Sequence, residues 1–261
     1  MALYILGNGF DLAHGLKTRY SDFRDYLAKK QRNKISSLLD TLESVYDQDK
    51  LWSDFERALG NPNENFIKEV NALFGIDLFG SLFIGKLRQE FKSWIQEAIF
   101  SKLEVSPRYP LSNNDKFISF NYTQVLEFVY AISDANILHI HGCVELDKFK
   151  DDIFVLGHNK EINKDSPEIL KATKKDTSKV IANNSKILKE FMSRCHEVKM
   201  IGFSYSDIDL PYFIYLTNLN RDAVWNFGYY SDNDKRKIQK YITAMRLEPH
   251  QVKLFCTDNR R

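Results

Sequence analysis

The chain begins with a short, uninterrupted apolar run, residues 2–6 (ALYIL), which stops at Gly7. A run of this length without alternating polar positions is typical of a strand buried on both faces of a parallel sheet. Similar runs recur further along the chain, and we expect a strand at each of them: 117–120, 136–142, 153–158, 197–201, 223–230 and 251–256.

A different pattern fills the interval between the first two expected strands. Segments 21–30, 34–47 and 85–103 place apolar residues three or four positions apart, which is the period of an amphipathic helix. The clearest case is the series Leu87, Phe91, Trp94, Ile95 and Ala98. Two further helices are expected at 185–195 and 232–245.

Strands that alternate with helices predict an α/β fold with a doubly wound, mainly parallel, Rossmann-like sheet. We expect a single domain over residues 1–261, with its core in 1–20 and 113–261 and a large helical insertion at 21–112, after the first strand. The lysine-rich stretch 160–179 is interpreted as a solvated loop or insertion.

Charge and cysteine content say little about the partners and the cellular environment of the protein. The formal net charge is +2, which does not by itself indicate a nucleic-acid or membrane partner, although nucleic acid stays open. The three cysteines are far apart and form no CxxC pair, as expected of a protein from a reducing, cytoplasmic environment. No apolar run approaches the roughly 18 residues that a membrane span needs, so we expect a soluble protein without a membrane partner.

The first candidate for chemistry is the turn Gly7-Asn8-Gly9. Such a turn could cradle a phosphate at the start of a helix, or could simply join a strand to a helix. It departs from the dinucleotide fingerprint GxGxxG, because Leu12 stands where the third glycine would be and the next glycine is Gly15. Asp11 would then cap the helix or accept a hydrogen bond from a ribose hydroxyl.

Further candidates follow the second and third expected strands. Asn121, next to Tyr122, both donates and accepts hydrogen bonds, so it could hold a ribose hydroxyl or a water, or could merely form a turn. His139 and His141 would share a face of a strand, because strand side chains alternate. His141 could act as a general base, while a structural role fits His139 better.

The same two histidines could instead begin a metal site, which would need further ligands. His158 and Asp207 are the available candidates, although no spacing singles them out. Asp207 also belongs to the last candidate segment, in which Gly202 and Ser204 follow a strand and would admit a nucleotide. Both Asp207 and the following Asp209 could equally form the polar start of a helix. A serine hydrolase is not expected, because the GxSxG motif fails at Ser206.

These segments carry a family resemblance. Residues 3–23 (LYILGNGFDLAHGLKTRYSDF) resemble the N-terminal signature of the AbiH family of bacterial abortive-infection proteins. Residues 120–123 (FNYT), 139–142 (HIHG) and 201–209 (IGFSYSDID) resemble the rest of its core. A more distant similarity reaches the sirtuin-like NAD-binding fold, in which the corresponding roles would fall to Gly7, Gly9, Gly15, Asn121, His141, Gly202 and Ser204.

Two departures from the sirtuin-like pattern limit what this similarity implies. The proline-aspartate-phenylalanine-arginine segment is replaced by residues 17–20 (KTRY), and no cysteines are placed to build a zinc module. Protein deacetylation is therefore not expected.

The resemblance implies a phage-defence protein whose nucleotide pocket binds NAD or a related nucleotide. It leaves open whether the nucleotide is only bound or is also cleaved, as by an NAD glycohydrolase. Asn121 and His141 would be catalytic, and no metal is expected. The implied cofactor-binding residues are Gly7, Asn8, Gly9, Phe10, Asp11, Gly15, Tyr122, Gly202, Ser204 and Asp207. The alternatives are a metal-dependent nuclease or nucleic-acid-acting toxin, and a non-catalytic, nucleotide-gated sensor. A phage-derived trigger or a partner protein would be a further ligand, and the oligomeric state stays open.

Overall fold

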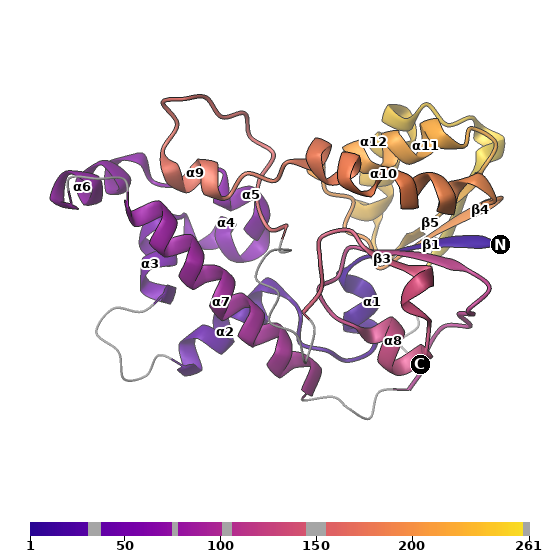
Figure 1. Cartoon of the computed structure of the whole chain (residues 1–261), viewed down its shortest axis with the longest axis horizontal. Helices are drawn as coiled ribbons and strands as arrows, with labels where there is room; N and C mark the ends of the chain where they lie inside the picture. The colour runs from indigo at the N-terminus through magenta and orange to yellow at the C-terminus, as the bar shows by residue number, and fades with distance from the viewer. Residues whose placement is uncertain (31–37, 75–77, 101–105, 145–154, 258–261) are drawn as a thin grey trace. The chain divides into compact units, whose positions relative to one another are not determined.

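The computed structural model describes residues 1–30, 38–74, 78–100, 106–144 and 155–257. Its contacts divide the chain into two units (Figure 1). The sheet unit consists of Met1–Lys17, Ile99–Ile153 and Thr177–Arg261. The helical unit consists of Thr18–Ala98 and Phe154–Asp176.

Six strands from the described residues form one sheet in which every neighbouring pair is parallel. They are β1 (Ala2–Leu6), β2 (Lys116–Ser119), β3 (Ile137–His139), β4 (Glu197–Ile201), β5 (Val224–Tyr229) and β6 (Val252–Cys256), in the order β3-β2-β1-β4-β5-β6. This is the order of the Rossmann fold, which reverses between β1 and β4. The expected doubly wound, Rossmann-like sheet is confirmed.

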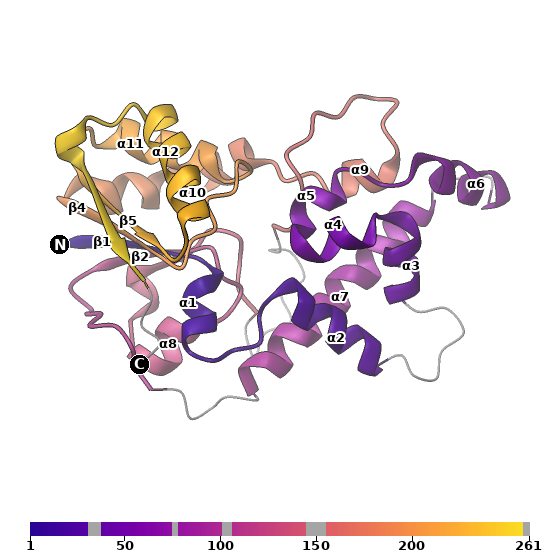
Figure 2. The same cartoon turned by 180° about the vertical axis from the view of Figure 1, so that it is seen from behind.

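Helices cover both faces of this sheet. Figures 1 and 2 show α1 (Asn8–Ala13) and α8 (Val125–Tyr130) on one face, and three longer helices on the other. The longer helices are α10 (Thr177–Ser193), α11 (Leu210–Leu219) and α12 (Asp232–Met245). Two short 3₁₀ turns, η1 (Asp134–Asn136) and η2 (Pro249–Gln251), precede β3 and β6.

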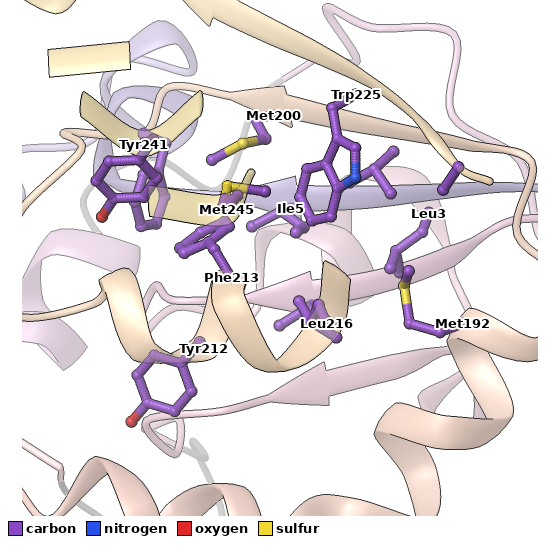
Figure 3. Close-up of a cluster of buried hydrophobic side chains, with 14 of the residues drawn as sticks. Leu3, Ile5, Met192, Met200, Tyr212, Phe213, Leu216, Trp225, Tyr241 and Met245 are labelled. Atoms are coloured by element: carbon purple, nitrogen blue, oxygen red, sulfur yellow. The ribbon is translucent and has the colours of Figure 1, made fainter. Parts of the chain in front are cut away.

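The main hydrophobic core lies between the sheet and the three longer helices (Figure 3). Alternate residues of β1, Leu3 and Ile5, join this core, as the period of a strand requires. Phe213 of α11 and Tyr241 of α12 pack together with a ring separation of 5.2 Å, and Trp225 of β5 is fully buried. This packing fixes the strands whose carboxyl ends carry the candidate site.

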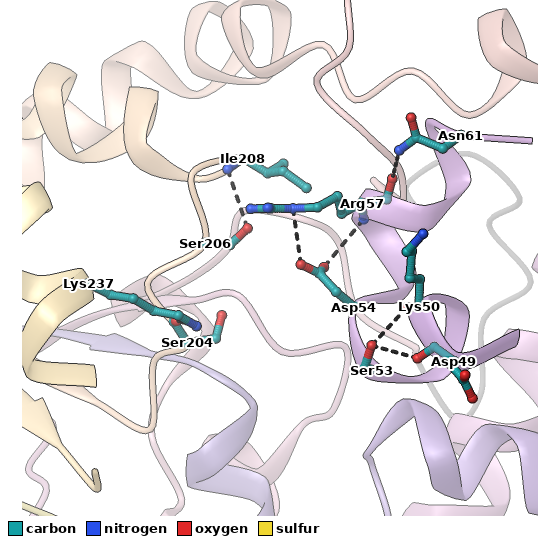
Figure 4. Close-up of polar contacts among 10 residues, drawn as sticks. All are labelled: Asp49, Lys50, Ser53, Asp54, Arg57, Asn61, Ser204, Ser206, Ile208 and Lys237. Carbon is teal, nitrogen blue, oxygen red and sulfur yellow. Dashed lines mark hydrogen bonds and ion pairs between the residues drawn. The ribbon is translucent and has the colours of Figure 1, made fainter. Parts of the chain in front are cut away.

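The helical unit contains α2 (Tyr20–Lys30), α3 (Leu38–Val45), α4 (Gln48–Ser53), α5 (Phe55–Leu59), α6 (Glu64–Phe74), α7 (Leu78–Phe100) and α9 (Glu168–Ala172). The apolar series predicted to form one helix face is buried along α7. Phe23 of α2 packs against Phe91 and Trp94 of α7, at ring separations of 5.4 and 5.0 Å. Asp54 caps α5 and pairs with Arg57 at 3.2 Å (Figure 4).

The strand expected at 153–158 is wrong over residues 155–158. Residues 153 and 154 lie outside the described residues, and 155–158 form only an isolated bridge between His158 and Lys174. The His158 N–H donates to the Thr173 carbonyl at 3.0 Å, and the Lys175 N–H donates to the His158 carbonyl at 2.8 Å. The apolar run therefore packs within the helical unit instead of adding a strand to the sheet.

The lysine-rich stretch is also less solvated than expected. The Lys175 side chain is fully buried and pairs with Glu56 Oε2 at 3.4 Å. Thr173 is buried as well, and it donates to the Ile169 carbonyl at 2.7 Å. This part of the chain is packed against α5.

Candidate functional site

The loops that follow β1 and β4 meet backbone to backbone at the point where the strand order reverses. The Gly7 N–H donates to the Ile201 carbonyl at 3.0 Å, and the Gly9 N–H donates to the Gly202 carbonyl at 2.8 Å. A Cβ atom on Gly9 would lie 2.6 Å from Gly202 Cα, and Gly202 has a φ of +64°. These glycines are therefore required by the close approach of two loops.

This contact limits what the turn can offer to a ligand. The Gly9 N–H is bonded to Gly202, and the Phe10 N–H donates to the Gly7 carbonyl at 2.8 Å. Two of the amides at the start of α1 are thus used within the protein. A phosphate bound at this edge of the sheet would need other donors.

Gly15 also has a structural explanation. It follows the end of α1 with a φ of +79°, a backbone conformation that favours glycine. Its N–H donates to the Leu12 carbonyl at 3.0 Å, and the Leu16 N–H donates to the Asp11 carbonyl at 3.2 Å. This pair of bonds is the Schellman arrangement that ends many helices.

Asp11 is buried under the loop that follows β2. Asn121 Nδ2 donates to Asp11 Oδ1 at 2.8 Å, and Thr123 Oγ1 donates to Asp11 Oδ2 at 2.7 Å. Gly7, not Asp11, is the N-cap of α1, so the capping interpretation of Asp11 is wrong. Burial raises the pKa of the Asp11 carboxyl to about 7, although the hydrogen bonds from Thr123 and Asn121 act to lower it.

His139 is engaged in a pair of its own. Its Nε2 lies 2.7 Å from Glu127 Oε1, and its Nδ1 lies 3.4 Å from the Asn121 carbonyl oxygen. The strand β3 ends at His139, so the alternation that would have placed His141 on the same face does not extend that far. The two histidines have different partners.

His141 lies in the turn after β3 and is buried, with 3% of its surface exposed. Its Nε2 lies 3.8 Å from Oδ1 of Asp209, which is also buried. Phe120 packs edge-on against the imidazole at a ring separation of 4.9 Å, and Tyr212 and Tyr122 lie at 5.6 and 6.5 Å. The histidine and the carboxylate thus face each other in an aromatic surrounding, at ion-pair distance and without a direct hydrogen bond.

Three loops supply this site. Asn121 and Tyr122 follow β2, His141 follows β3, and Asp209 follows β4. Asp209 was predicted only as a polar residue beside Asp207 at the start of a helix, and not as a site residue. The structure places Asp209 in the buried position next to His141, whereas Asp207 is exposed.

The other predicted residues are arranged differently. Asn8 and Ser204 are exposed, and Lys237 Nζ donates to the Ser204 carbonyl at 3.0 Å (Figure 4). Phe10 is fully buried and its ring stacks on Tyr109 at 5.5 Å, so it belongs to the core beneath α1.

His14 is a buried histidine that the sequence analysis missed. Its Nδ1 lies 2.7 Å from the Phe10 carbonyl oxygen, and its Nε2 lies 2.7 Å from the Tyr130 hydroxyl. That hydroxyl oxygen accepts hydrogen bonds from the backbone N–H groups of Arg108 and Tyr109. Burial lowers the pKa of His14, and this network ties the end of α1 to α8.

One family model, described as bacteriophage abortive infection AbiH, matches residues 3–79 and 80–229. The chain belongs to the AbiH family. The match includes every residue of the site described above and ends with β5. Membership supports a role in abortive infection by phage.

Comparison with curated proteins and with solved structures gave no match. The sirtuin-like similarity of this AbiH chain consequently rests on its sequence motifs alone. No helix in the described part of the chain is both long and apolar enough to cross a membrane.

Within the same described ranges, no three or more His, Cys, Asp or Glu residues are grouped as a metal site would require. His158, one of the suggested ligands, uses both ring nitrogens inside the helical unit. Its Nε2 lies 3.1 Å from the Leu170 carbonyl oxygen, and its Nδ1 accepts a hydrogen bond from the Lys160 N–H at 3.1 Å.

Proposed function

We propose that this AbiH protein binds NAD at the carboxyl edge of its sheet and hydrolyses the bond between nicotinamide and ribose during phage infection. The observation that carries the proposal is the buried pair of His141 and Asp209, with Nε2 3.8 Å from Oδ1. Histidines that face a neighbouring carboxylate are common as general bases.

The position of the pair supports a nucleotide as the ligand. In open parallel sheets, ligands bind outside the carboxyl ends of the strands, near the point where the strand order reverses. The loops after β2, β3 and β4 bring Asn121, His141 and Asp209 to this edge. The residues implied as cofactor-binding stay part of this proposal where they remain accessible, whereas Gly7, Phe10 and Asp11 are buried. The accessible ones are Asn8, Gly9, Gly15, Tyr122, Gly202, Ser204 and Asp207.

The proposed reaction follows from these groups. The carbon–nitrogen bond to nicotinamide breaks, its electron pair leaves with the neutral base, and water adds to the sugar carbon. His141 accepts the proton that this water or a ribose hydroxyl loses, and the Asp209 carboxylate stabilises the resulting imidazolium. The Phe120 and Tyr212 rings would exclude other water molecules and favour a cationic sugar.

The test is the release of nicotinamide from NAD by the purified protein, with and without an extract of phage-infected cells. We expect His141→Ala to lower the rate at least about 100-fold. Asp209→Asn is expected to lower it by a smaller factor. Asp222→Asn, which neutralises an exposed aspartate of the same unit, serves as the matched control and should keep the full rate.

Three other results are informative. NAD binding without nicotinamide release under either condition would contradict hydrolysis and favour a nucleotide-gated sensor. The absence of both binding and release would contradict the nucleotide site itself. Cleavage of RNA or DNA that a chelator abolishes would instead support the metal-dependent nuclease.

A further inference from the structure

The proposed NAD site includes Asn121, but the two side chains bonded around it have no role in the proposal. Asp11, Asn121 and Thr123 are 1%, 5% and 3% exposed, respectively. Both carboxylate oxygens of Asp11 accept a hydrogen bond, one from each of the other two side chains. Such a buried chain of hydrogen bonds specifies the orientation of each member.

The hydrogen bonds of the Asn121 amide determine what it can offer to a ligand. Its Nδ2 carries two hydrogens, and it donates to the Gly7 carbonyl at 3.1 Å and to Asp11 Oδ1 at 2.8 Å. Both partners are acceptors, so rotation of the amide by 180° would place Oδ1 against two oxygens. Among the described residues, none donates to Asn121 Oδ1.

We propose that Asp11 is a positioning residue, which commits Asn121 to act only as a hydrogen-bond acceptor and so selects a donor on the ligand. A sugar hydroxyl or an attacking water meets this requirement, whereas a phosphate or carboxylate oxygen does not. The identity of the ligand rests on the proposed function, but the orientation of Asn121 does not.

A purely structural role for Asp11 is the alternative. The same hydrogen bonds join the loop after β1 to the loop after β2, so their loss would loosen both loops. A loss of stability alone would therefore not distinguish the two roles. The measurements have to report on the Asn121 amide and on turnover.

Two substitutions at Asp11 separate the roles. In Asp11→Asn, the new Oδ1 can accept from Asn121 and the new amide can donate to the Thr123 hydroxyl, so the arrangement is kept. Asp11→Leu keeps the branch at Cγ and is larger, but it has no acceptor. Thr217→Val is a matched control for the loss of a buried polar group, because Thr217 is 1% exposed and its hydroxyl donates to the Phe213 carbonyl of its own helix at 2.8 Å.

Turnover of NAD is the first measurement. We expect Asp11→Leu to lower kcat on the order of 10- to 100-fold and Asp11→Asn to recover most of this loss. The double variant Asp11→Leu/Asn121→Ala should be no slower than Asn121→Ala, because the two residues act as one group. Equal turnover of wild type and Asp11→Leu, or losses that multiply in the double variant, would overturn the proposal.

The second measurement does not depend on NAD. The side-chain amide protons of Asn121, identified in an NMR spectrum by their loss in Asn121→Ala, should exchange slowly in wild type and in Asp11→Asn. They should exchange at the rate of an exposed amide in Asp11→Leu. Fast exchange in wild type overturns the positioning role, whereas slow exchange together with absent hydrolysis overturns only the proposed function.

If Asp11→Leu does not fold, two other variants test the same hydrogen bond. Asn121→Asp would replace the amide that donates to Asp11 by a second carboxyl group. Two carboxylates at this distance repel each other, which should lower the stability of the folded protein. Adding Asp11→Asn restores a donor between the two positions, so the double variant should be more stable to heat than Asn121→Asp alone. A double variant that is less stable than either single variant would contradict the proposed bond.

Discussion

The buried carboxyl of Asp11 makes a specific prediction about how stability depends on pH. Burial raises its pKa from 3.8 to about 7 in the folded protein. The folded state therefore holds a proton that the unfolded chain has already released over this interval. The free energy of unfolding should fall as the pH rises from about 4 to 7 and should level off above pH 7.

The change in the free energy of unfolding can be calculated from the difference between the pKa of Asp11 in the folded and the unfolded protein. Near pH 5 the two states differ by close to one proton at this site, and the difference falls to about half a proton at pH 7 and almost to zero at pH 8. A difference of one proton is equivalent to about 1.4 kcal/mol for each pH unit. The Asp11 carboxyl should thus lower the free energy of unfolding by about 3 kcal/mol between pH 5 and pH 8. Asp11→Asn has no ionisable group at this position, so this contribution should disappear.

Urea denaturation at pH 5 and pH 8 measures this difference. The chain has three tryptophans, of which Trp225 lies in the core of the sheet unit. Replacement of Trp52 and Trp94 by phenylalanine leaves Trp225 as the fluorescence reporter of that unit. The comparison of wild type with Asp11→Asn in this background cancels the contribution of every other titrating group.

Asp222→Asn provides the control, because it removes an exposed carboxyl from the same unit. It should leave the difference between pH 5 and pH 8 unchanged. If wild type and Asp11→Asn lose the same free energy of unfolding between the two pH values, the reasoning from burial is refuted.

Three other substitutions test neighbouring parts of the account. Gly9→Ala places a methyl group 2.6 Å from Gly202 Cα and should lower the stability of the sheet unit by about 1–3 kcal/mol in thermal unfolding. Lys175→Met leaves the buried side of Glu56 without its ammonium partner and should cost about 3 kcal/mol, and Lys175→Met/Glu56→Gln should regain part of this loss. Lys237→Ala removes a cation beside the loop after β4 and should raise the KM for NAD about tenfold with little change in kcat. Wild-type stability in the first two variants, or a fall in kcat alone in the third, would contradict these expectations.

Much of the fold could be predicted because it depends on local patterns. The expected helix at 232–245 coincides with α12, whose start carries a capping box formed by Ser231 and Asp234. The first apolar run coincides with β1. In both cases the hydrophobic period and the flanking residues lie within one short segment, so a single window of sequence contains the necessary information.

The strand that was wrongly predicted at 153–158 shows where a short segment of sequence is not enough to predict the structure. Its apolar residues are compatible with a buried strand or with a packed loop, and periodicity alone does not separate the two. The outcome depends on pairing with residues 173–175, which come about fifteen positions later. The burial of Lys175 depends on Glu56, more than a hundred positions away, and no local pattern reports it.

The candidate site was predictable in the same limited way. The rule that ligands bind at the carboxyl ends of parallel strands indicated Asn121 and His141. It could not show that Asp209, rather than Asp207, reaches His141, because the conformation of the loop after β4 decides this. Nor could it show that Asp11 accepts from Asn121, since the two residues are 110 positions apart.

The central claim is that His141 and Asp209 cleave NAD during infection. The most direct measurement is the NAD content of phage-infected cells that carry the wild-type protein, His141→Ala or Asp209→Asn, with uninfected cells as reference. NAD is expected to fall after infection with the wild-type protein, to fall more slowly with Asp209→Asn, and to stay at the level of uninfected cells with His141→Ala. An unchanged NAD level with wild type, or an equal fall with His141→Ala, would contradict the claim.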